Sequence, residues 1–222
     1  MTLSEQSSTG DQHAIRRYRL ADSQDDFTSR PDDLGRAVQH LRAAILPDTQ
    51  EQARSQILDF CHENLDALHR SSLDGHLTAS AFVVDLTSKS LALIHHRKLE
   101  MWLQPGGHAD GEGNLLKVAA TEVEEEVGLG DLAFVLPAFD VDVHAIPERD
   151  DVPAHLHLDL RFLAFTSGTP SLDGNEETNA ADWVHLDDLR MNEGDAVIGA
   201  ARRAIGLATD LARIQPEPIR RR

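Results

Sequence analysis

The sequence predicts an α+β fold in which a mixed β-sheet packs against helices. Helical patterns occupy the first third of the chain. Strand patterns dominate from His76 onward, with one helix inserted among them and another at the end. Several strand patterns follow one another across short turns, which is typical of hairpins and so of mixed rather than purely parallel pairing. We therefore favour an α+β fold, or an α/β/α sandwich, over a doubly wound fold.

A polar segment and two helices are predicted ahead of the strands. Residues 1–30 are rich in Ser, Asp and Gln, and we expect them to be mobile. Pro31 and Asp32 are typical of a helix start, and apolar residues then recur at helical spacing. A second helix is predicted over residues 49–70, with inward positions at Ile57, Cys61, Leu65 and Leu68. Residues 31–72 thus form a predicted helical hairpin that packs on the main domain or on a second subunit.

The main domain is predicted over residues 76–214. The segments LTASAFVVD and SLALIHH flank a short polar turn, and we expect them to pair as a β-hairpin. In HLHLDLRFLAF, large apolar side chains alternate with His and Asp, so the apolar residues share one face of a strand. A short strand is expected at DWVHL, and a final helix over about residues 195–214. A basic tail at 215–222 follows.

The composition limits the classes of partner. The net charge is −17, whereas binding to duplex nucleic acid needs a basic face. The sequence contains no apolar run of the length that spans a membrane, and the N-terminus lacks the apolar region of a secretory signal. Cys61 is the only cysteine, which excludes an intramolecular disulfide. We expect a cytoplasmic protein that binds neither nucleic acid nor membrane.

The run PGGHADGEGNLLKVAATEVEEEVGL, residues 105–129, carries the chemical signal. It predicts a helix over 114–127 that places Glu122, Glu125 and Glu126 on one side, at spacings i, i+3 and i+4. Like charges at these spacings repel unless a cation lies among them, and hard divalent cations prefer carboxylate oxygens. A solvated acidic face is the competing explanation. The proline-led glycine turn, which lets backbone carbonyls approach an ion, favours the metal.

These residues resemble the Nudix box, whose pattern is G, five residues, E, seven residues, then R-E-U-x-E-E-x-G-U, where U is a bulky aliphatic residue. The positions that match are Gly107, Glu122, Val123, Glu125, Glu126, Gly128 and Leu129. The approach WLQPGG is typical of bacterial members, and the element order from 76 to 214 also resembles the family. Residues 1–70 are not covered by the resemblance. It implies a Nudix-type α/β/α sandwich with a mixed sheet.

The resemblance also implies an activity and its residues. The family hydrolyses a nucleoside diphosphate linked to another group, such as a nucleoside diphosphate sugar, ADP-ribose or a modified nucleoside triphosphate, with Mg²⁺ or Mn²⁺. The backbone carbonyl of Gly106 and the carboxylates of Glu122, Glu125 and Glu126 would hold the metal. Glu122 and Glu125 are also the catalytic candidates inside the box. Outside it, the loop GNEETNAADW offers Glu177 first as the base, then Glu176 and Asp182.

Two positions depart from the pattern. Gly113 stands where the box has glutamate, and Thr121 where it has arginine. In the family these two side chains commonly pair and brace the helix. Losing both partners of a pair costs far less than losing one, so the joint absence is coherent with activity. Glu112, one residue earlier, is the candidate to take part of the missing role, and the orientation of Glu122 and Glu125 is what the departures put in question.

Substrate contacts are expected beside the box. Cationic contacts for phosphate are expected from Arg97, Lys98 and Arg161. Gly107 and His108 follow the metal-binding glycine and are expected to touch the phosphates. Trp102 is expected either to stack on a base or to pack in the core. The pattern His155-x-His157-x-Asp159 has the ligand types of a transition-metal site, although outward polar residues on a strand are the more ordinary explanation.

Other functions stay open at this point. A Nudix-like sensor that binds a nucleotide without cleaving it is favoured by the absent Glu and Arg, whereas the intact ExxEE disfavours it. Isopentenyl diphosphate isomerase shares the fold but needs a cysteine in the site, and Cys61 lies in the wrong region, in a helix where a small core residue is expected. A homodimer is possible, because an added helical region often accompanies dimers in the nucleoside diphosphate sugar subgroup.

Overall fold

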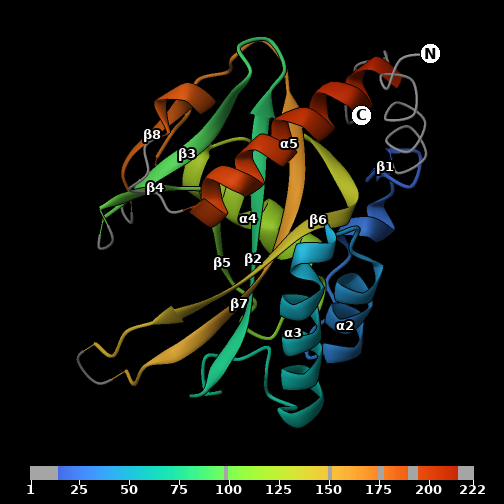
Figure 1. Ribbon diagram of the computed structural model, residues 1–222, viewed down its shortest axis with the longest axis vertical. Coiled ribbons are helices and arrows are strands. Elements are labelled where there is room, and N and C mark those ends of the chain that lie inside the picture. Colours follow the sequence, from blue (N-terminus) through green and yellow to red (C-terminus); the bar gives the residue numbers. More distant parts are fainter. Residues whose placement is uncertain (1–14, 98–99, 150–151, 175–177, 190–194, 215–222) are drawn as a thin grey trace, which may run out of the picture.

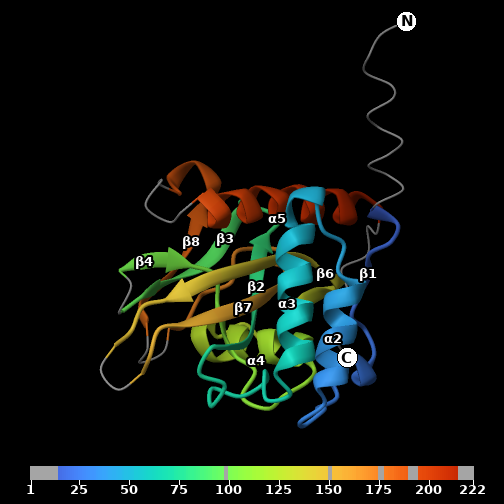
Figure 2. The same ribbon diagram turned by 60° about the horizontal axis from the view of Figure 1, so that its bottom comes forward.

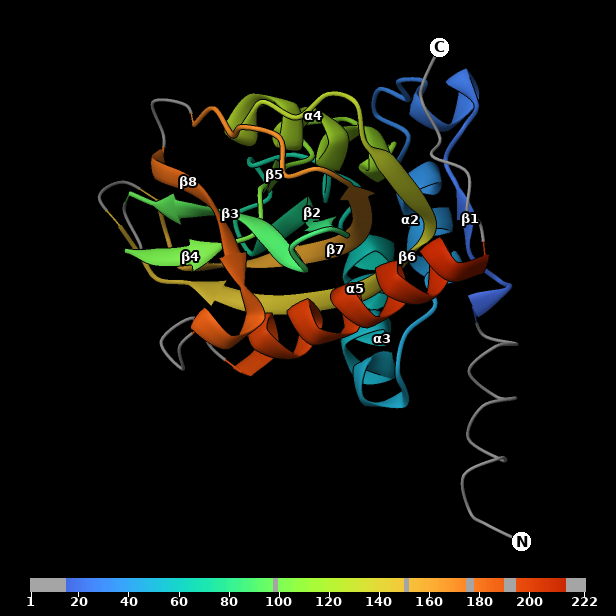
Figure 3. The same ribbon diagram turned by 90° about the horizontal axis from the view of Figure 1, so that it is seen from above.

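An eight-stranded mixed sheet with helices on both faces forms the framework of the protein (Figures 1–3). The computed structural model describes residues 15–97, 100–149, 152–174, 178–189 and 195–214 of the 222-residue chain. The strands are β1 (Arg19–Leu20), β2 (Gly75–Asp85), β3 (Ser90–His96), β4 (Met101–Leu103), β5 (Gly106–His108), β6 (Ala133–Ile146), β7 (His155–Thr166) and β8 (Thr178–His185). The helices are α2 (Leu34–Ala43), α3 (Glu51–Glu63), α4 (Leu115–Val127) and α5 (Asp195–Ile214), with the 3-10 turns η1 (Gln24–Phe27), η2 (Asp48–Gln50) and η3 (Leu186–Asp188).

The long strand β2 lies at the centre of the sheet and has different neighbours at its two ends. It pairs in parallel with β7 along its whole length, and β6 pairs with β7 in antiparallel register. The upper end of β2 in Figure 1 forms the expected hairpin with β3, where Asp85 opposes Ser90. The short strand β5 pairs with β2 farther down, where Ala79 opposes Gly107. The mixed pairing predicted from the sequence is therefore confirmed.

Side-chain alternation along β2 divides the core into two layers. Leu77, Ala79, Ala81 and Val83 belong to a core shared with α4, whereas Phe82 and Val84 belong to a second core beneath α5. Figure 3 shows α4 and α5 on opposite sides of the sheet. The register of β2 with β7 extends the same division: Leu158 and Leu160 face the α4 side, and Leu163 faces α5. The alternation predicted for HLHLDLRFLAF is confirmed, and the predicted final helix coincides with α5.

The helices α2 and α3 lie side by side at the β6 edge of the sheet (Figure 2). Their inward side chains, among them Leu41, Ile57 and Cys61, join the same core as α4. The prediction for Leu65 was wrong, since this residue is 85% exposed. The reason is that α3 ends at Glu63, so Leu65 falls in the turns after the helix rather than on its inward face.

Residues 15–30 are folded onto the sheet, which differs from the mobile segment that their polar composition predicted. The strand β1 pairs with β6, where Leu20 opposes Val135. The Arg19 guanidinium donates to both carboxylate oxygens of Asp26, and Phe27 packs edge-on against Phe134. The contacts with β6 join residues more than a hundred positions apart, which is why local composition gave no sign of them. No described helix has both the length and the apolar character needed to cross a membrane.

Candidate active site at the glutamate helix

Helix α4 is held at both ends. Its N-cap residue, Asn114, is almost fully buried, and its side-chain amide donates to the carbonyls of Asp26 and Thr28, at 2.9 Å each. The Asn114 Oδ1 atom lies 3.1 Å from Nε2 of His40 on α2. At the other end Gly128 adopts φ 73°, and its N–H caps the carbonyl of Glu124, as expected for a helix stop. The segment before β2, residues 15–72, which we call the N-terminal extension, therefore fixes the start of the glutamate helix.

Glu126 and Glu122 contact the two glycines of the PGG sequence. The backbone N–H of Gly106 donates to Oε2 of Glu126 over 2.9 Å, and Glu126 is only 7% exposed. A Cβ atom added to Gly107 would lie 2.1 Å from Oε1 of Glu122. The Glu122 carboxylate thus occupies the space that any side chain at position 107 would need.

The glycines serve close approach, not a turn. We expected a tight turn at Gly106 and Gly107, but both residues lie in the strand β5, paired with Ser80 and Ala79 of β2. Neither glycine is among the residues with positive φ. A Cβ added to Gly106 would lie 2.3 Å from the Cβ of Ser80. Both positions therefore exclude a side chain because of what packs against them.

The third glutamate, Glu125, is exposed on the same side of the helix. Together the three residues present carboxylates that are buried, half-buried and open to solvent, beside the backbone of β5. Oxygen donors of this kind suit a hard divalent cation such as Mg²⁺ or Mn²⁺, which keeps some coordination positions for water or phosphate. The residues present therefore fit such an ion.

Glu112 stabilises the loop before α4, where the box glutamate is absent. Its carboxylate accepts from the backbone N–H groups of Arg30, at 2.6 Å, and Asn114, at 2.8 Å. The hydroxyl of Ser29 also donates to it, and Lys117 lies 3.6 Å away. These bonds hold the pKa of Glu112 below its usual value despite its burial, which acts in the opposite direction. Glu112 connects the loop to the N-terminal extension, so it takes part of the missing bracing role with different partners.

Gly113 has a steric reason to be glycine. A Cβ atom at this position would lie 2.2 Å from the carbonyl oxygen of Asp33, and the Gly113 N–H donates to the carbonyl of Arg30 over 2.9 Å. The extension therefore occupies the volume that the family's glutamate side chain would fill. Thr121, at the position of the family's arginine, is exposed.

Arg161 is not a substrate contact, and that prediction is corrected. Its side chain is 4% exposed and is ion-paired with three carboxylates, those of Asp140, Asp142 and Asp159, at 2.9–3.2 Å. Asp159 also accepts from the hydroxyls of Thr78 and Ser80. These carboxylates accept from three of the five guanidinium N–H groups and offset its charge, and the buried side chain does not face solvent, from which a phosphate would approach. Only the strand register, which the sequence does not show, brings these residues together.

The remaining predicted contacts differ in their surroundings. Arg97 is exposed beside Asn179 on β8, so its cationic group faces solvent. Trp102 packs against the core beneath α5 and edge-on against His95, which gives it a packing role at the edge of the sheet. Asp182 is exposed on β8, and its carboxylate accepts from the N–H of Trp183. Lys98, Glu176 and Glu177 lie outside the described residues.

His108 lies on the face of the sheet opposite Gly107 and belongs to a group of histidines. Its Nε2 atom is 3.2 Å from Nε2 of His157. Burial, with nearby positive charges, lowers the pKa of His108 to about 4. Burial and the neighbouring imidazoles lower the pKa of His157 to about 2. Both rings are therefore neutral at pH 7, and His108 brings no positive charge to a phosphate.

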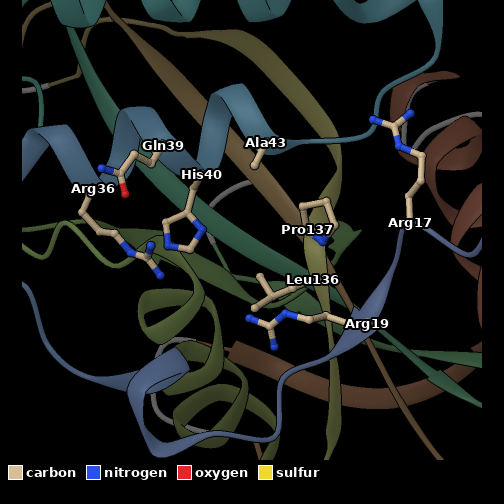
Figure 4. A pocket seen from close by; sticks show the side chains of 8 residues that line it. All are labelled: Arg17, Arg19, Arg36, Gln39, His40, Ala43, Leu136 and Pro137. Carbon is tan, nitrogen blue, oxygen red and sulfur yellow. The ribbon is translucent and has the colours of Figure 1, made fainter.

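The cavity shown in Figure 4 is separate from the glutamates. It has a volume of about 320 Å³ and is lined mainly by side chains of the N-terminal extension (Figure 4). Those side chains are Arg17, Arg19, Arg36, Gln39, His40, Ala43, Leu136 and Pro137. None of these residues belongs to the glutamate helix or to β5. This cavity therefore does not identify the site of chemistry.

Comparison with known proteins gives one family match. A model described as the NUDIX domain matches residues 75–202, more than half of the chain. No curated protein matches the sequence. A NUDIX-family hydrolase from Clostridium perfringens has 23% identity and a TM-score of 0.43, covering 60% of this chain and 97% of that one. The dihydroneopterin triphosphate pyrophosphohydrolase of E. coli has 16% identity and a TM-score of 0.46, covering 58% and 91%. The NUDIX domain of Shewanella oneidensis NrtR, complexed with ADP ribose, has 15% identity and a TM-score of 0.36, covering 64% and 88%.

Proposed function

The chain belongs to the Nudix hydrolase family, and on that premise we propose that it cleaves the diphosphate linkage of a small nucleoside diphosphate derivative with bound Mg²⁺ or Mn²⁺. A nucleoside diphosphate sugar, ADP-ribose or a modified nucleoside triphosphate are the candidate substrates. The contact of the α4 carboxylates with the β5 backbone carries the proposal. Glu126 accepts from Gly106, and the Glu122 carboxylate fills the space beside Gly107.

The proposed roles follow from these positions. Glu126, which is buried and oriented by the Gly106 N–H, acts as a fixed metal ligand. Glu122, half-buried against Gly107, and Glu125, exposed, complete the carboxylate set together with the Gly106 carbonyl. When bound there, the divalent ion supplies charge neutralisation for the diphosphate and acidifies a water molecule. Glu122 and Glu125 are then the candidates to orient that water or to accept its proton, as is Glu177 from the loop before β8.

The charge of the chain sets a condition on the substrate. With a net charge of −17, a diphosphate is repelled unless cations lie in its path. Arg97, exposed between β3 and β4, is the described side chain that we propose for this contact. Gly107 is proposed to let the phosphates approach the backbone closely. The same charge supports a small-molecule substrate in place of a nucleic acid. The lone cysteine supports a cytoplasmic location, and a homodimer remains part of the proposal.

The alternatives find less support. The absence of the Glu–Arg pair favoured a silent sensor. However, Glu112 and the N-terminal extension brace the start of α4 by other contacts. An isomerase needs a cysteine at the reacting atoms, whereas Cys61 is buried on α3 in the main core, where burial raises its pKa to about 11. The expectation that Cys61 is a core residue is confirmed.

The test is a panel of compounds incubated with the purified protein in Mg²⁺ or Mn²⁺, with the products separated by chromatography. The panel contains nucleoside diphosphate sugars, ADP-ribose, dinucleotides and oxidised nucleoside triphosphates, each also run with a chelator. We expect at least one compound to be split at its diphosphate linkage, and only when the metal is present. Binding of these compounds without any metal-dependent product would overturn the hydrolase and leave a sensor.

A further inference from the structure

Histidines gather on the part of the sheet that α5 leaves uncovered. The strand registers place His76 opposite His157, and His108 opposite Thr78, on the face away from α4. His144 lies opposite His157 on β6, and His155 precedes it on β7. In Figure 1, α5 crosses the upper part of this face, and the lower ends of β2, β6 and β7 extend beyond it. Four strands, β2, β5, β6 and β7, therefore bring their imidazoles together.

Three of these rings have the spacing of a metal site. Ring nitrogens of His76, His108 and His157 all lie within 4.8 Å of one another. The Nε2 atoms of His108 and His157 are 3.2 Å apart. Imidazole nitrogens bind Zn²⁺ at about 2.0–2.1 Å, so two ligands of a tetrahedral ion are separated by roughly 3.3 Å. The His108–His157 pair already has this separation, and a ring nitrogen of His76 lies within 4.8 Å of both.

His76 supplies an independent observation. It is 4% exposed, and its buried Nε2 atom has no hydrogen-bond partner among the described residues. Its Nδ1 atom faces the carbonyl of Ser72 at 3.4 Å, so the proton belongs on Nδ1 and the lone pair on Nε2. A histidine whose far nitrogen donates to a backbone carbonyl is the usual arrangement at protein metal sites. A buried nitrogen without a hydrogen-bond partner is unfavourable, and a bound ion would give it a partner.

An opening leads to these rings. A cavity of about 270 Å³ is lined by His76, His108 and His155, together with Arg70 and residues of the β6–β7 connection. Arg70 at its rim is ion-paired with Asp110, with contacts of 2.6 and 2.7 Å, so its positive charge is offset. An ion and a fourth ligand can therefore reach the cluster from solvent.

We propose that His76, His108 and His157 bind a divalent transition metal of the Zn²⁺ type through their ring nitrogens, with a fourth position open to the cavity. Three imidazoles suit Zn²⁺, whereas Mg²⁺ takes oxygen ligands, so this site and the α4 carboxylates select different ions. The two sites also lie on opposite faces of the sheet, because His108 and Gly107 are neighbours on β5. The proposal therefore does not depend on the proposed hydrolase activity.

The test is Zn²⁺ binding by the full chain without an affinity tag, measured by equilibrium dialysis. We expect the wild type and Glu126→Gln to bind about one Zn²⁺ ion with equal affinity, since three imidazoles make one site. His157→Gln and His108→Gln are expected to weaken binding at least about tenfold. His62→Gln is the control, because His62 is exposed on α3 and does not belong to the cluster, and it should bind Zn²⁺ as the wild type does.

A second measurement uses only the wild type and so does not depend on the folding of any variant. Co²⁺ in place of Zn²⁺ should give the intense visible absorption of a four-coordinate site with three imidazole ligands, and added Zn²⁺ should abolish it. Failure of the wild type to take up Zn²⁺, or a six-coordinate Co²⁺ spectrum, would overturn the proposal. So would equal Zn²⁺ affinity in the wild type and in a folded His157→Gln variant.

Discussion

At the scale of single residues, the site depends on side chains that are absent as well as present. Gly107 leaves a volume that the Glu122 carboxylate occupies, and Gly106 leaves one beside Ser80. The sequence predicts a turn at these two glycines. In the structure they lie in β5, and they are glycine because Ser80 and the Glu122 carboxylate pack closely against them. The glutamates were candidates because of their helical spacing together with the glycines upstream. Their contacts with β5 could not be predicted, because these depend on how a helix and a strand pack.

Gly107→Ala tests this contact. The new methyl group would overlap Oε1 of Glu122 and displace the carboxylate, so we expect metal-dependent hydrolysis to fall by about a hundredfold. Gly206→Ala on α5 is the matched control, since nothing lies within 4 Å of its added Cβ. It should keep full activity and gain roughly 0.5–1 kcal/mol of stability. Steady-state kinetics and denaturant unfolding measure both effects, and wild-type activity in Gly107→Ala would show that Glu122 needs no fixed position.

At the scale of elements, helix α4 depends on the N-terminal extension for its position. The side chain of the buried Asn114 bonds to the segment before α2 and also to His40 of α2. The Glu112 carboxylate accepts from the backbone N–H of Arg30. The two helices of the extension were predictable from apolar periodicity. Their role in holding the glutamate helix was not, since Gly113 and Thr121 showed only that the family's own bracing pair is missing.

Restoring the family's glutamate at position 113 should therefore harm this protein. The first side-chain atom of Gly113→Glu would lie 2.2 Å from the Asp33 carbonyl oxygen, so we expect the free energy of unfolding to fall by about 1–3 kcal/mol. Thr121→Arg is the comparison, because Thr121 is exposed, and it should change stability by less than about 0.5 kcal/mol. Urea unfolding measures the free energy of unfolding of both variants and of the wild type. An unchanged stability in Gly113→Glu would mean that the extension is not seated on this loop.

The buried His40, which contacts Asn114 at the start of α4, makes the stability of the protein depend on pH. Burial lowers the pKa of His40 from 6.5 to about 4, and Arg36 acts in the same direction. As the pH falls, His40 therefore binds a proton in the unfolded chain before it does so in the folded protein. The stability that His40 contributes is fully present above pH 6.5 and is lost as the pH falls toward 4, by about 3 kcal/mol. Unfolding free energies measured across this range should fall more steeply for the wild type than for His40→Asn. The same pH dependence of the unfolding free energy in the wild type and in His40→Asn would contradict the lowered pKa of His40.

At the scale of the whole molecule, the sheet separates two sets of functional side chains. Alternation on β5 directs Gly107 toward α4 and His108 toward the opposite face, where β2 and β7 contribute His76 and His157. The sequence predicted the mixed sheet, the position of α5 and the alternating faces of β7, because each follows from local periodicity. It could not predict the histidine cluster, which needs the register of β2 with β5 and β7, or the Arg161 ion pairs, which need the register of β6 with β7.

The central claim is that the α4 carboxylates hold the ion on which hydrolysis depends. It is tested most directly by the Mg²⁺ dependence of product release in the wild type, Glu126→Gln and Glu124→Gln. Glu126 contacts the Gly106 N–H, whereas Glu124 is exposed, so the two substitutions make the same chemical change inside and outside the site. We predict saturable Mg²⁺ dependence for the wild type and Glu124→Gln, and a loss of at least about a hundredfold in a folded Glu126→Gln. Equal activity of the two variants at every Mg²⁺ concentration would contradict the account.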